Sequence, residues 1–487
     1  MSKKISFMRE KDIEIVNSNV DDIIEKAHNR EITMIKPTLD DFNKVKSIIL
    51  NFIKKNKRII YGGYAWNTLI SNIKPGDAFY KDNQYTDVEF YSNKPIEDMK
   101  ELCDILYDKG FSFIQGKSAQ HPETYTIFVE FNACCDISYV PTHIFNTMMT
   151  EHINGVRYVH PKFIYVDILR QFNDPILSFR RLDKNIKRGR LLINNFPLKF
   201  NDKAIEQTKS IFDSRKKIGP AILNEFLLSQ LVKMKSIIFI GDIAFNAYNN
   251  PNKDFDKQTT IYDCLSPIEI ISTDLVKDVK YIYNTVIKYF IENKKSDEIS
   301  DKIIVEQFYP FFQFTDKKVV FKYNNNVFLT VYGSNDKCIP YNDIKIDIDG
   351  KSLPIIIGTF NVLFMYILIK FHHLNANKDR DGQNLQDYYM FTLLNKRNEF
   401  LDSLNKTVLD RTIFEDFKIE CLGETESPMR NYYKSMKDRS LLPRSAIFPY
   451  DPEVKRDNYP TDIYYFNNTS GNIINNSKDF VIDVNKN

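Results

Sequence analysis

The stretch Arg58-Ile-Ile-Tyr-Gly-Gly-Tyr-Ala-Trp-Asn67 recurs in a weaker form as Ile238-Phe-Ile-Gly-Asp-Ile-Ala-Phe-Asn246. In both stretches a short apolar run meets a glycine and then a second, mostly apolar segment. This pattern predicts a buried strand, a tight turn and the start of a helix. The matching parts begin at Ile59 and Ile238, 179 positions apart in a chain of 487 residues. A repeat at that distance indicates two copies of one α/β module.

Further segments repeat in the same order. Thr86-Asp-Val-Glu-Phe-Tyr-Ser92 corresponds to Ser266-Pro-Ile-Glu-Ile-Ile-Ser272. A predicted strand pair over 124–140 corresponds to one over 318–332, and a predicted helix over 163–172 corresponds to one over 360–371. The sequence therefore predicts an α+β fold of two tandem modules with mixed sheets flanked by helices. The predicted parts are an N-terminal helical segment (1–50), a first module (51–160), a basic helical region (161–219), a second module (220–375), a C-terminal helical and extended region (376–466) and a disordered Asn-rich tail (467–487).

Local signals add detail before and within the first module. Pro37 is expected to start a helix ahead of the strand near Arg58. Residues 84–92 have the composition of a strand, and a proline at 95 with a glycine at 110 frames a helix over 95–108. Two β runs follow over 124–131 and 133–140, and Asn154-Gly155 predicts a tight hairpin turn.

The composition excludes several classes of protein. Hydrophobic residues make up 43% and charged residues 27% of the chain, which excludes disorder for most of it. The net charge of +3 provides no global field, so any nucleic-acid site depends on local clustering. Six scattered cysteines without a Cys-x-x-Cys pair predict a chain without disulfides or zinc, in a reducing compartment. Because the chain has neither an apolar run of membrane-spanning length nor an apolar signal core, we expect a soluble intracellular protein.

The first module carries three features that together suggest a reaction. Gly62-Gly63 stands between a predicted strand and helix, where backbone N–H groups can approach a phosphate, although such a pair is also ordinary turn chemistry. Asp87 and Glu89 follow on a predicted strand, where positions i and i+2 share a face. Two neighbouring carboxylates are either an exposed, solvated pair or the ligands of a cation.

The third feature is a carboxylate inside an apolar strand. Asp136 interrupts Ala133-Cys-Cys-Asp-Ile-Ser-Tyr-Val140, and a charge there is costly unless it is paired with a basic side chain or bound to a metal. Glu130 is the competing candidate for the same role. Oxygen ligands of this kind suit a hard cation such as Mg²⁺.

A basic segment follows the first module. Residues 157–217 contain 15 Lys and Arg against 6 Asp and Glu, so the excess of +9 exceeds the net charge of the whole chain. Positions 180, 184, 187 and 188 fall on one face of a predicted helix. That face is either solvated or a contact surface for a triphosphate or an RNA backbone. The basic residues of this helix are Arg180, Arg181, Lys184, Lys187, Arg188 and Arg190.

A glycine pair, an acidic strand and one Asp on a later strand resemble the nucleotidyltransferase superfamily with the polymerase-β-like palm. The chain resembles more specifically the poly(A) polymerases of large cytoplasmic DNA viruses, in particular the giant-virus, Mimivirus-like branch. The parts that carry this resemblance are the run 58–67, the strand 86–92 and the segments 163–170 and 178–190. The resemblance covers most of residues 40–450. It implies two tandem polymerase-β-like modules and a template-independent enzyme that adds AMP from ATP to the 3′ end of viral mRNA.

The resemblance also implies roles for individual residues. Its metal ligands and catalytic residues correspond to Asp87, Glu89 and Asp136, which would hold two Mg²⁺ or Mn²⁺ ions. Its nucleotide-binding positions correspond to Gly62, Gly63, Tyr64, Arg180, Arg181 and Lys184. Tyr64 departs from the Ser that many nucleotidyltransferases carry beside the γ-phosphate, and Glu89 departs from the commoner Asp.

The implied partners are ATP and an RNA 3′ end, in the host cytoplasm or virion and without a membrane. Whether a second copy of the chain or an accessory viral subunit also binds is left open. The alternative functions are a CCA-adding or oligoadenylate-type nucleotidyltransferase and a non-catalytic RNA-binding scaffold.

The second copy lacks most of these residues. Its turn is Gly241-Asp242, Pro267 aligns with Asp87, and Leu329 aligns with Asp136, so that only Glu269 remains of the three carboxylates. We therefore expect the second module to be degenerate and catalytically inactive.

Overall fold

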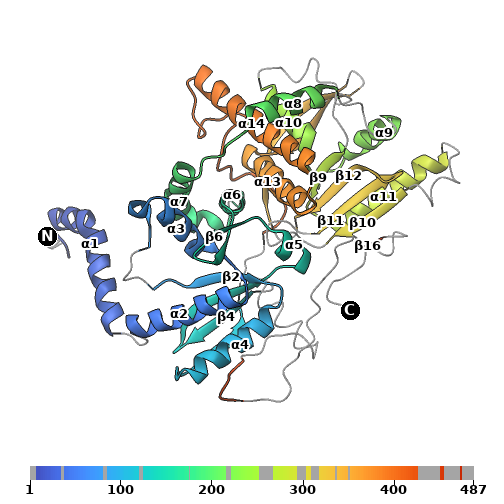
Figure 1. Cartoon of the computed structure of the whole chain (residues 1–487). Coiled ribbons are helices and arrows are strands. Elements are labelled where there is room, and N and C mark those ends of the chain that lie inside the picture. The colour runs from blue at the N-terminus through green and yellow to red at the C-terminus, as the bar shows by residue number, and fades with distance from the viewer. Residues whose placement is uncertain are drawn as a thin grey trace, which may run out of the picture.

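The computed structural model contains two mixed β-sheets with helices packed on and between them (Figure 1). It describes residues 7–34, 38–80, 85–119, 124–174, 176–214, 221–251, 267–292, 303–308, 317–334, 337–348, 351–425, 450–454 and 472–473. Pro37 lies outside these residues, so its predicted role as a helix start is not tested. Most of the tail that was predicted to be disordered also lies outside them.

Two helices precede the first sheet, α1 (Glu10–Met34) and α2 (Leu39–Lys55). α2 begins at Thr38, whose hydroxyl accepts a hydrogen bond from the N–H of Asp41 at 3.3 Å. Its apolar stripe, which includes Val45 and Ile49, is buried in the core. α1 has no such cover among the described residues, and Figure 1 shows it projecting from the rest of the chain.

The first sheet has the strand order β3-β4-β5-β2-β1-β7-β6. Its central strand β2 pairs antiparallel with β1 and parallel with β5. The predicted hairpin turn is confirmed, since Asn154 and Gly155 between β6 and β7 both have positive φ. The elements are β1 (Ile59–Tyr61), α3 (Gly62–Ile73), η1 (Pro75–Asp77), β2 (Val88–Ser92), α4 (Pro95–Asp108), β3 (Gln115–Ser118), β4 (Thr124–Val129), β5 (Asn132–Tyr139), α5 (Thr142–Thr147), β6 (Thr150–Ile153) and β7 (Val156–Val159).

The second sheet has the order β15-β13-β14-β8-β9-β12-β11-β10-β16. Reversed and without its two end strands, this order matches the first sheet strand for strand, from β10 in the place of β3 to β13 in the place of β6. The predicted duplication is therefore visible in the topology. The elements are β8 (Ile237–Ile240), α10 (Gly241–Asn249), β9 (Ile268–Ser272), α11 (Leu275–Glu292), β10 (Ile303–Phe308), β11 (Lys318–Tyr323), β12 (Asn326–Gly333), β13 (Ile339–Ile348), β14 (Lys351–Gly358), β15 (Cys421–Leu422) and β16 (Asn472–Ile473).

Helices from the two halves pack against each other. The ring of Phe163 on α6 (Pro161–Phe172) lies 5.5 Å from that of His372 on α13 (Phe360–Ala376). Nearby, Lys162 pairs with Asp387 of α14 (Arg380–Ser403) at 2.9 Å. These contacts fix α6, which also borders the candidate site, against the second half. The remaining helices are η2 (Ser178–Arg181), α7 (Leu182–Asn195), α8 (Asp202–Ser214) and α9 (Ala221–Leu231).

Two predicted elements differ in extent. The strand predicted over 84–92 begins at Val88, so Asp87 precedes the strand instead of lying on it. The basic helix is divided, because Arg180 and Arg181 belong to the 3-10 turn η2 and α7 starts only at Leu182.

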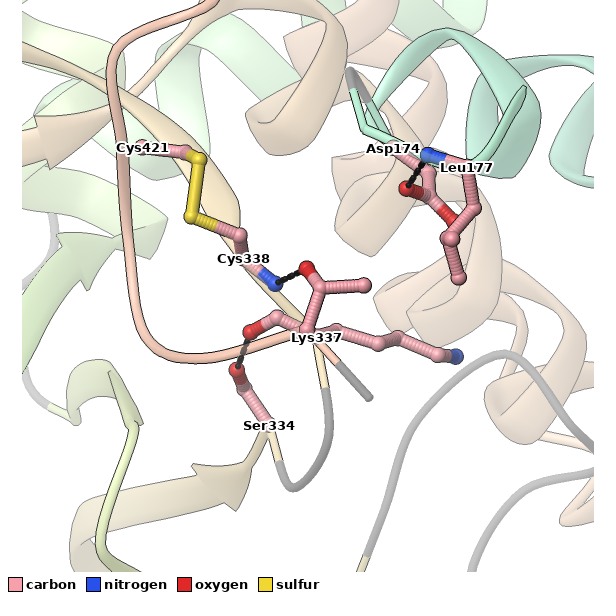
Figure 2. Close-up of a disulfide and its surroundings, with 7 residues drawn as sticks. Asp174, Leu177, Ser334, Lys337, Cys338 and Cys421 are labelled. Carbon is pink, nitrogen blue, oxygen red and sulfur yellow. Dashed lines mark hydrogen bonds between the residues drawn. A yellow bond between two sulfur atoms is a disulfide. The ribbon is translucent and has the colours of Figure 1, made fainter. Parts of the chain in front are cut away.

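The prediction of a chain without disulfides is wrong. Cys338 and Cys421 form a disulfide that joins the start of β13 to β15, with their Cα atoms 5.3 Å apart (Figure 2). These cysteines are 83 positions apart in sequence, and only the antiparallel pairing of Pro340 with Cys421 brings them together. The disulfide removes the basis for expecting a reducing compartment. As to membranes, a helix with the length and apolar character needed to cross one is absent from the described residues.

Candidate active site

The Gly62-Gly63 turn lies directly beside Glu89. Tyr61, the last residue of β1, pairs with Glu89 of β2, and the next residue opens α3. Gly62 has a φ of +67°, and a Cβ there would lie 1.7 Å from a carboxylate oxygen of Glu89. Only glycine fits this position, for both reasons. The N–H of Gly63 donates to Oε2 of Glu89 at 2.8 Å, so a carboxylate occupies the N-terminus of α3.

The other two candidate carboxylates border Glu89. Asp136 of β5 is the register partner of Glu89 on the parallel strand β2. Its Oδ1 accepts a hydrogen bond from the hydroxyl of Thr126 at 2.5 Å, a partner that the sequence did not indicate. Asp87 is exposed just ahead of β2. The structure thus brings all three predicted acids to one region of the sheet, whereas Glu130 lies away from it, in the β4–β5 turn.

Two of these acids, Glu89 and Asp136, have raised pKa values. Burial raises the pKa of Glu89 to about 8, and the charges of Asp87 and Asp136 add to the effect against the Gly63 hydrogen bond. Burial and Asp87 likewise raise the pKa of Asp136, against the hydrogen bond from Thr126. In the described part of the chain none of the three acids forms an ion pair. A cation between them would relieve this repulsion.

The side chains do not form a ready-made cage. Among the described residues, no three His, Cys, Asp or Glu side chains form a group that could hold a metal ion as they stand. In the structure the carboxylate of Glu89 accepts a hydrogen bond from the N–H of Gly63, and that of Asp136 accepts one from the hydroxyl of Thr126. The predicted metal ligands are therefore neighbours, but their role as ligands stays a prediction.

The basic residues predicted to bind nucleotide differ in position. Burial and the charge of Arg188 lower the pKa of Lys184, and the charges of Asp87 and Glu89 act in the opposite direction. Arg181 is also electrostatically coupled to Lys184. Lys187, which the helical pattern placed on the same face, pairs instead with Asp183 at 2.9 Å, and both side chains are well exposed. Arg180 is exposed on η2.

Tyr64 is oriented toward the body of the first module. It is half-buried in the first turn of α3, and Nζ of Lys46 on α2 lies 4.9 Å from the centre of its ring. Its assignment to nucleotide binding remains a prediction.

Comparison with known proteins identifies the family. A profile of the poly(A) polymerase catalytic subunit family matches residues 47–178, and a profile of the C-terminal part of the Acanthamoeba polyphaga mimivirus poly(A) polymerase catalytic subunit matches residues 213–484. The mimivirus poly(A) polymerase catalytic subunit is 30% identical over 488 residues, which span 95% of this chain and 82% of the relative. The chain belongs to the viral poly(A) polymerase catalytic subunits. Enzymes of this family are polynucleotide adenylyltransferases.

More distant and structural comparisons agree with this assignment. The poly(A) polymerase catalytic subunit of African swine fever virus (strain Badajoz 1971 Vero-adapted) is 30% identical over 174 residues, or 34% of this chain and 35% of the relative. The crystal structure of the Megavirus polyadenylate synthase matches with a TM-score of 0.79 and 29% identity, and covers 93% of this chain and 89% of that one. The predicted fold of two tandem nucleotidyltransferase modules is confirmed by this match and by the two sheets.

The second half of this poly(A) polymerase carries a modified version of the same turn. Gly241 also has positive φ, and a Cβ there would lie 2.5 Å from a carboxylate oxygen of Glu269. Glu269 pairs in register with Thr330 of β12, as Glu89 pairs with Asp136. The alignment of Leu329 with Asp136 is therefore wrong by one residue, and Leu329 is fully buried in the core.

Lysines compensate the charge in the second half. Nζ of Lys370 on α13 lies 3.0 Å from Oε1 of Glu269. The positive charge of Lys370 therefore neutralises Glu269, whereas a cation would be needed to neutralise the acids of the first half. Burial lowers the pKa of Lys318 on β11, two strands away from β9, to about 8, while Glu269 acts in the opposite direction. With one carboxylate already paired and Thr330 in place of the Asp, the described residues of this region offer no set of ligands comparable to the first half.

Replacing Glu269 tests this difference. Glu269→Ala is expected to leave nucleotide addition within about threefold of the wild type, because Glu269 has a lysine partner instead of neighbouring acids. The same change should lower the unfolding temperature, because it leaves Lys370 without its partner. Extension assays well below that temperature, combined with thermal melts, separate the two effects. A loss of activity as large as that of Asp87→Ala would contradict a single active site in the first half.

Proposed function

We propose that the first half of the chain transfers AMP from ATP to the 3′ end of RNA, with Asp87, Glu89 and Asp136 holding divalent cations. The observation that carries the proposal is the grouping of three acids without ion-pair partners beside the N-terminus of α3. Family membership supports poly(A) synthesis over CCA addition, oligoadenylate synthesis or a scaffold role. Mg²⁺ or Mn²⁺, as a pair of ions, fits a donor set made only of carboxylates. Bound there, they would activate the 3′-hydroxyl of the RNA and neutralise the triphosphate.

The residues of the chain act around this reaction centre. The N–H of Gly63 is aimed at an anion, and Glu89 is its acceptor in the structure. A phosphate oxygen that accepts from this N–H displaces the Glu89 carboxylate, which is then free to turn toward Asp87 and Asp136. Nucleotide binding at the glycine turn and assembly of the three carboxylates are thus one coupled event. Lys184, which is coupled to the acids, stabilises negative charge at the same place.

A direct assay tests the proposed activity. The full-length protein is incubated with a short RNA, Mg²⁺ or Mn²⁺, and each of the four nucleoside triphosphates in separate reactions. We expect stepwise lengthening of the RNA with ATP and little with the others. Limited addition of C and A residues would favour a CCA-adding enzyme, and RNA binding without any lengthening would favour a scaffold.

Three basic residues of η2 and α7, Arg180, Arg181 and Lys184, should govern RNA affinity more than chemistry. If Arg180, Arg181 and Lys184 contact phosphates, their joint replacement by Gln weakens RNA binding and lowers the slope of log K against log salt by about 0.7 per lost contact. Titrations of a labelled RNA at several salt concentrations measure this slope. The control is Lys187→Gln, because Lys187 is exposed and paired with Asp183. An unchanged slope in the triple variant would mean that these side chains are solvated and do not contact RNA phosphates.

A further inference from the structure

Arg188 lies closer to the glycine turn than its place in the basic helix suggests. A Cβ at Gly63 would lie 3.2 Å from Nη1 of Arg188 and 2.4 Å from the hydroxyl of Tyr80. The guanidinium and the phenol therefore cover the turn whose N–H group points toward Glu89. α7, which carries Arg188, packs directly against α3, which begins at this turn (Figure 1).

Aromatic rings hold the guanidinium in place. Its central carbon lies 4.1 Å from the ring centre of Phe79 and 4.9 Å from that of Tyr80. Within the described part of the chain, Arg188 makes no ion pair with a carboxylate. An arginine stacked on aromatic faces keeps its full positive charge and its planar set of donors. Arg188 is thus fixed at the turn without being neutralised.

The loop that supplies the two rings is tied to helices on both sides. Oδ1 of Asn67 on α3 accepts hydrogen bonds from the backbone N–H groups of Phe79 and Tyr80, at 2.7 and 2.9 Å. On the other side, Nδ2 of Asn195 at the end of α7 donates to Asp77 at 2.9 Å. The aromatic pair therefore has a fixed position relative to both α3 and α7.

Arg188 and Lys184 have different neighbours. Lys184, one turn earlier on α7, is electrostatically coupled to Asp87 and Glu89. Arg188 has aromatic neighbours, and its Nη1 lies beside Gly63, at a helix N-terminus suited to binding a phosphate. A guanidinium also matches the oxygens of a phosphate with paired donors, which a lysine cannot do.

We propose that Arg188 binds the triphosphate of the incoming nucleotide at the Gly62-Gly63 turn, and that Phe79 and Tyr80 are positioning residues that hold its guanidinium there. This inference rests on the proposed function and deepens it, because it assigns the triphosphate contact within that same site. The competing explanation is that Arg188 only joins α7 to α3.

Nucleotides with different numbers of phosphates distinguish the two explanations. Calorimetric titrations of the full-length protein with ATP, ADP and AMP are compared between the wild type and Arg188→Gln. We expect the affinity for ATP to fall about 10- to 100-fold and that for AMP by less than about threefold, because only the longer phosphate chain reaches the guanidinium. A purely structural role lowers all three affinities together.

Three further variants complete the test. Arg190→Gln is the matched control, because it removes the same charge from an exposed position two residues away. Arg188→Lys keeps the charge without the stacked plane and should recover part of the ATP affinity, and it replaces the Gln variant if that one fails to fold. Phe79→Leu should raise the KM for ATP several-fold with little change in kcat, because it removes the ring on which the guanidinium of Arg188 stacks.

The outcomes separate this inference from the proposed function. If the wild type binds ATP and extends RNA, but Arg188→Gln loses ATP and AMP affinity equally or behaves like Arg190→Gln, the Arg188 assignment is wrong and the function stands. If the wild type neither binds ATP nor extends RNA, both are wrong. Selective loss of ATP binding with normal thermal stability supports the assignment.

Discussion

Glu89→Gln and Asp87→Ala are each expected to reduce RNA extension by at least about 100-fold, the size of effect that loss of a metal-binding carboxylate produces. Both variants should fold. Asp87 is exposed ahead of β2, and Gln at position 89 keeps an oxygen that can accept the hydrogen bond from Gly63. Rates measured with saturating ATP and RNA, at several Mg²⁺ or Mn²⁺ concentrations, provide the test.

Stability should change in the opposite direction to activity. The pKa of Glu89 is raised to about 8, so its ionisation is less favourable in the folded chain than in the unfolded chain. The carboxylate therefore costs stability above its ordinary pKa of 4.5, and the cost grows until the pH passes about 8. Glu89→Gln removes this cost. Thermal melts should show the variant unfolding above the wild type at pH 8 and close to it at pH 5.

Glu269→Gln is the matched control for this result. It changes the corresponding glutamate beside the corresponding glycine turn, but Glu269 is stabilised by Lys370 whereas Glu89 is surrounded by acids. We expect Glu269→Gln to remain active and to unfold at a lower temperature. Near wild-type extension by Glu89→Gln, or a drop in its stability, would show that Glu89 has a structural role and would remove it from the active site.

The sequence was sufficient for the features that depend on local patterns. Gly62, which has a positive φ, and the proline-to-glycine frame of α4 each follow from the properties of single residues. The duplication was also visible, because corresponding strands keep their apolar pattern. The hairpins β6–β7 and β13–β14 also correspond in the two sheets, and in the sequence each has an Asx-Gly pair between its strands, Asn154-Gly155 and Asp349-Gly350.

Features that depend on tertiary contacts could not be predicted in the same way. The disulfide between Cys338 and Cys421 requires the pairing of β13 with β15, which no local motif encodes. The correspondence of Thr330 with Asp136 depends on strand register. The sequence alignment of the two modules crosses an insertion and therefore chose Leu329, one position away. The contact between Arg188 and the Phe79 ring joins α7 to a distant loop, and a helical pattern identifies only the face of a basic residue.

Asp136→Asn should be nearly as harmful as the loss of Glu89, whereas Glu130→Gln should leave extension within about twofold of the wild type. Asp136 is the register partner of Glu89, and Asp87 acts on its pKa. Glu130 has a φ of 46° in the β4–β5 turn. The strand from Asn132 to Asp136 separates this turn from Asp136 by about 13 Å. At that distance its carboxylate cannot bind the same cation as Glu89.

The choice of amide replacements makes this comparison a test of charge alone. The Asp136→Asn variant keeps a side-chain oxygen that can accept the hydrogen bond from Thr126, so the local structure of β5 should be retained. Thr126→Val is the companion variant, because it removes that hydrogen bond while the Asp136 carboxylate remains, and it should cost far less activity than Asp136→Asn. Equal residual activity of Asp136→Asn and Glu130→Gln would mean that neither acid is the third ligand. A large effect of Thr126→Val with a small effect of Asp136→Asn would indicate that the contribution of β5 is structural, since the charge on Asp136 would then be dispensable.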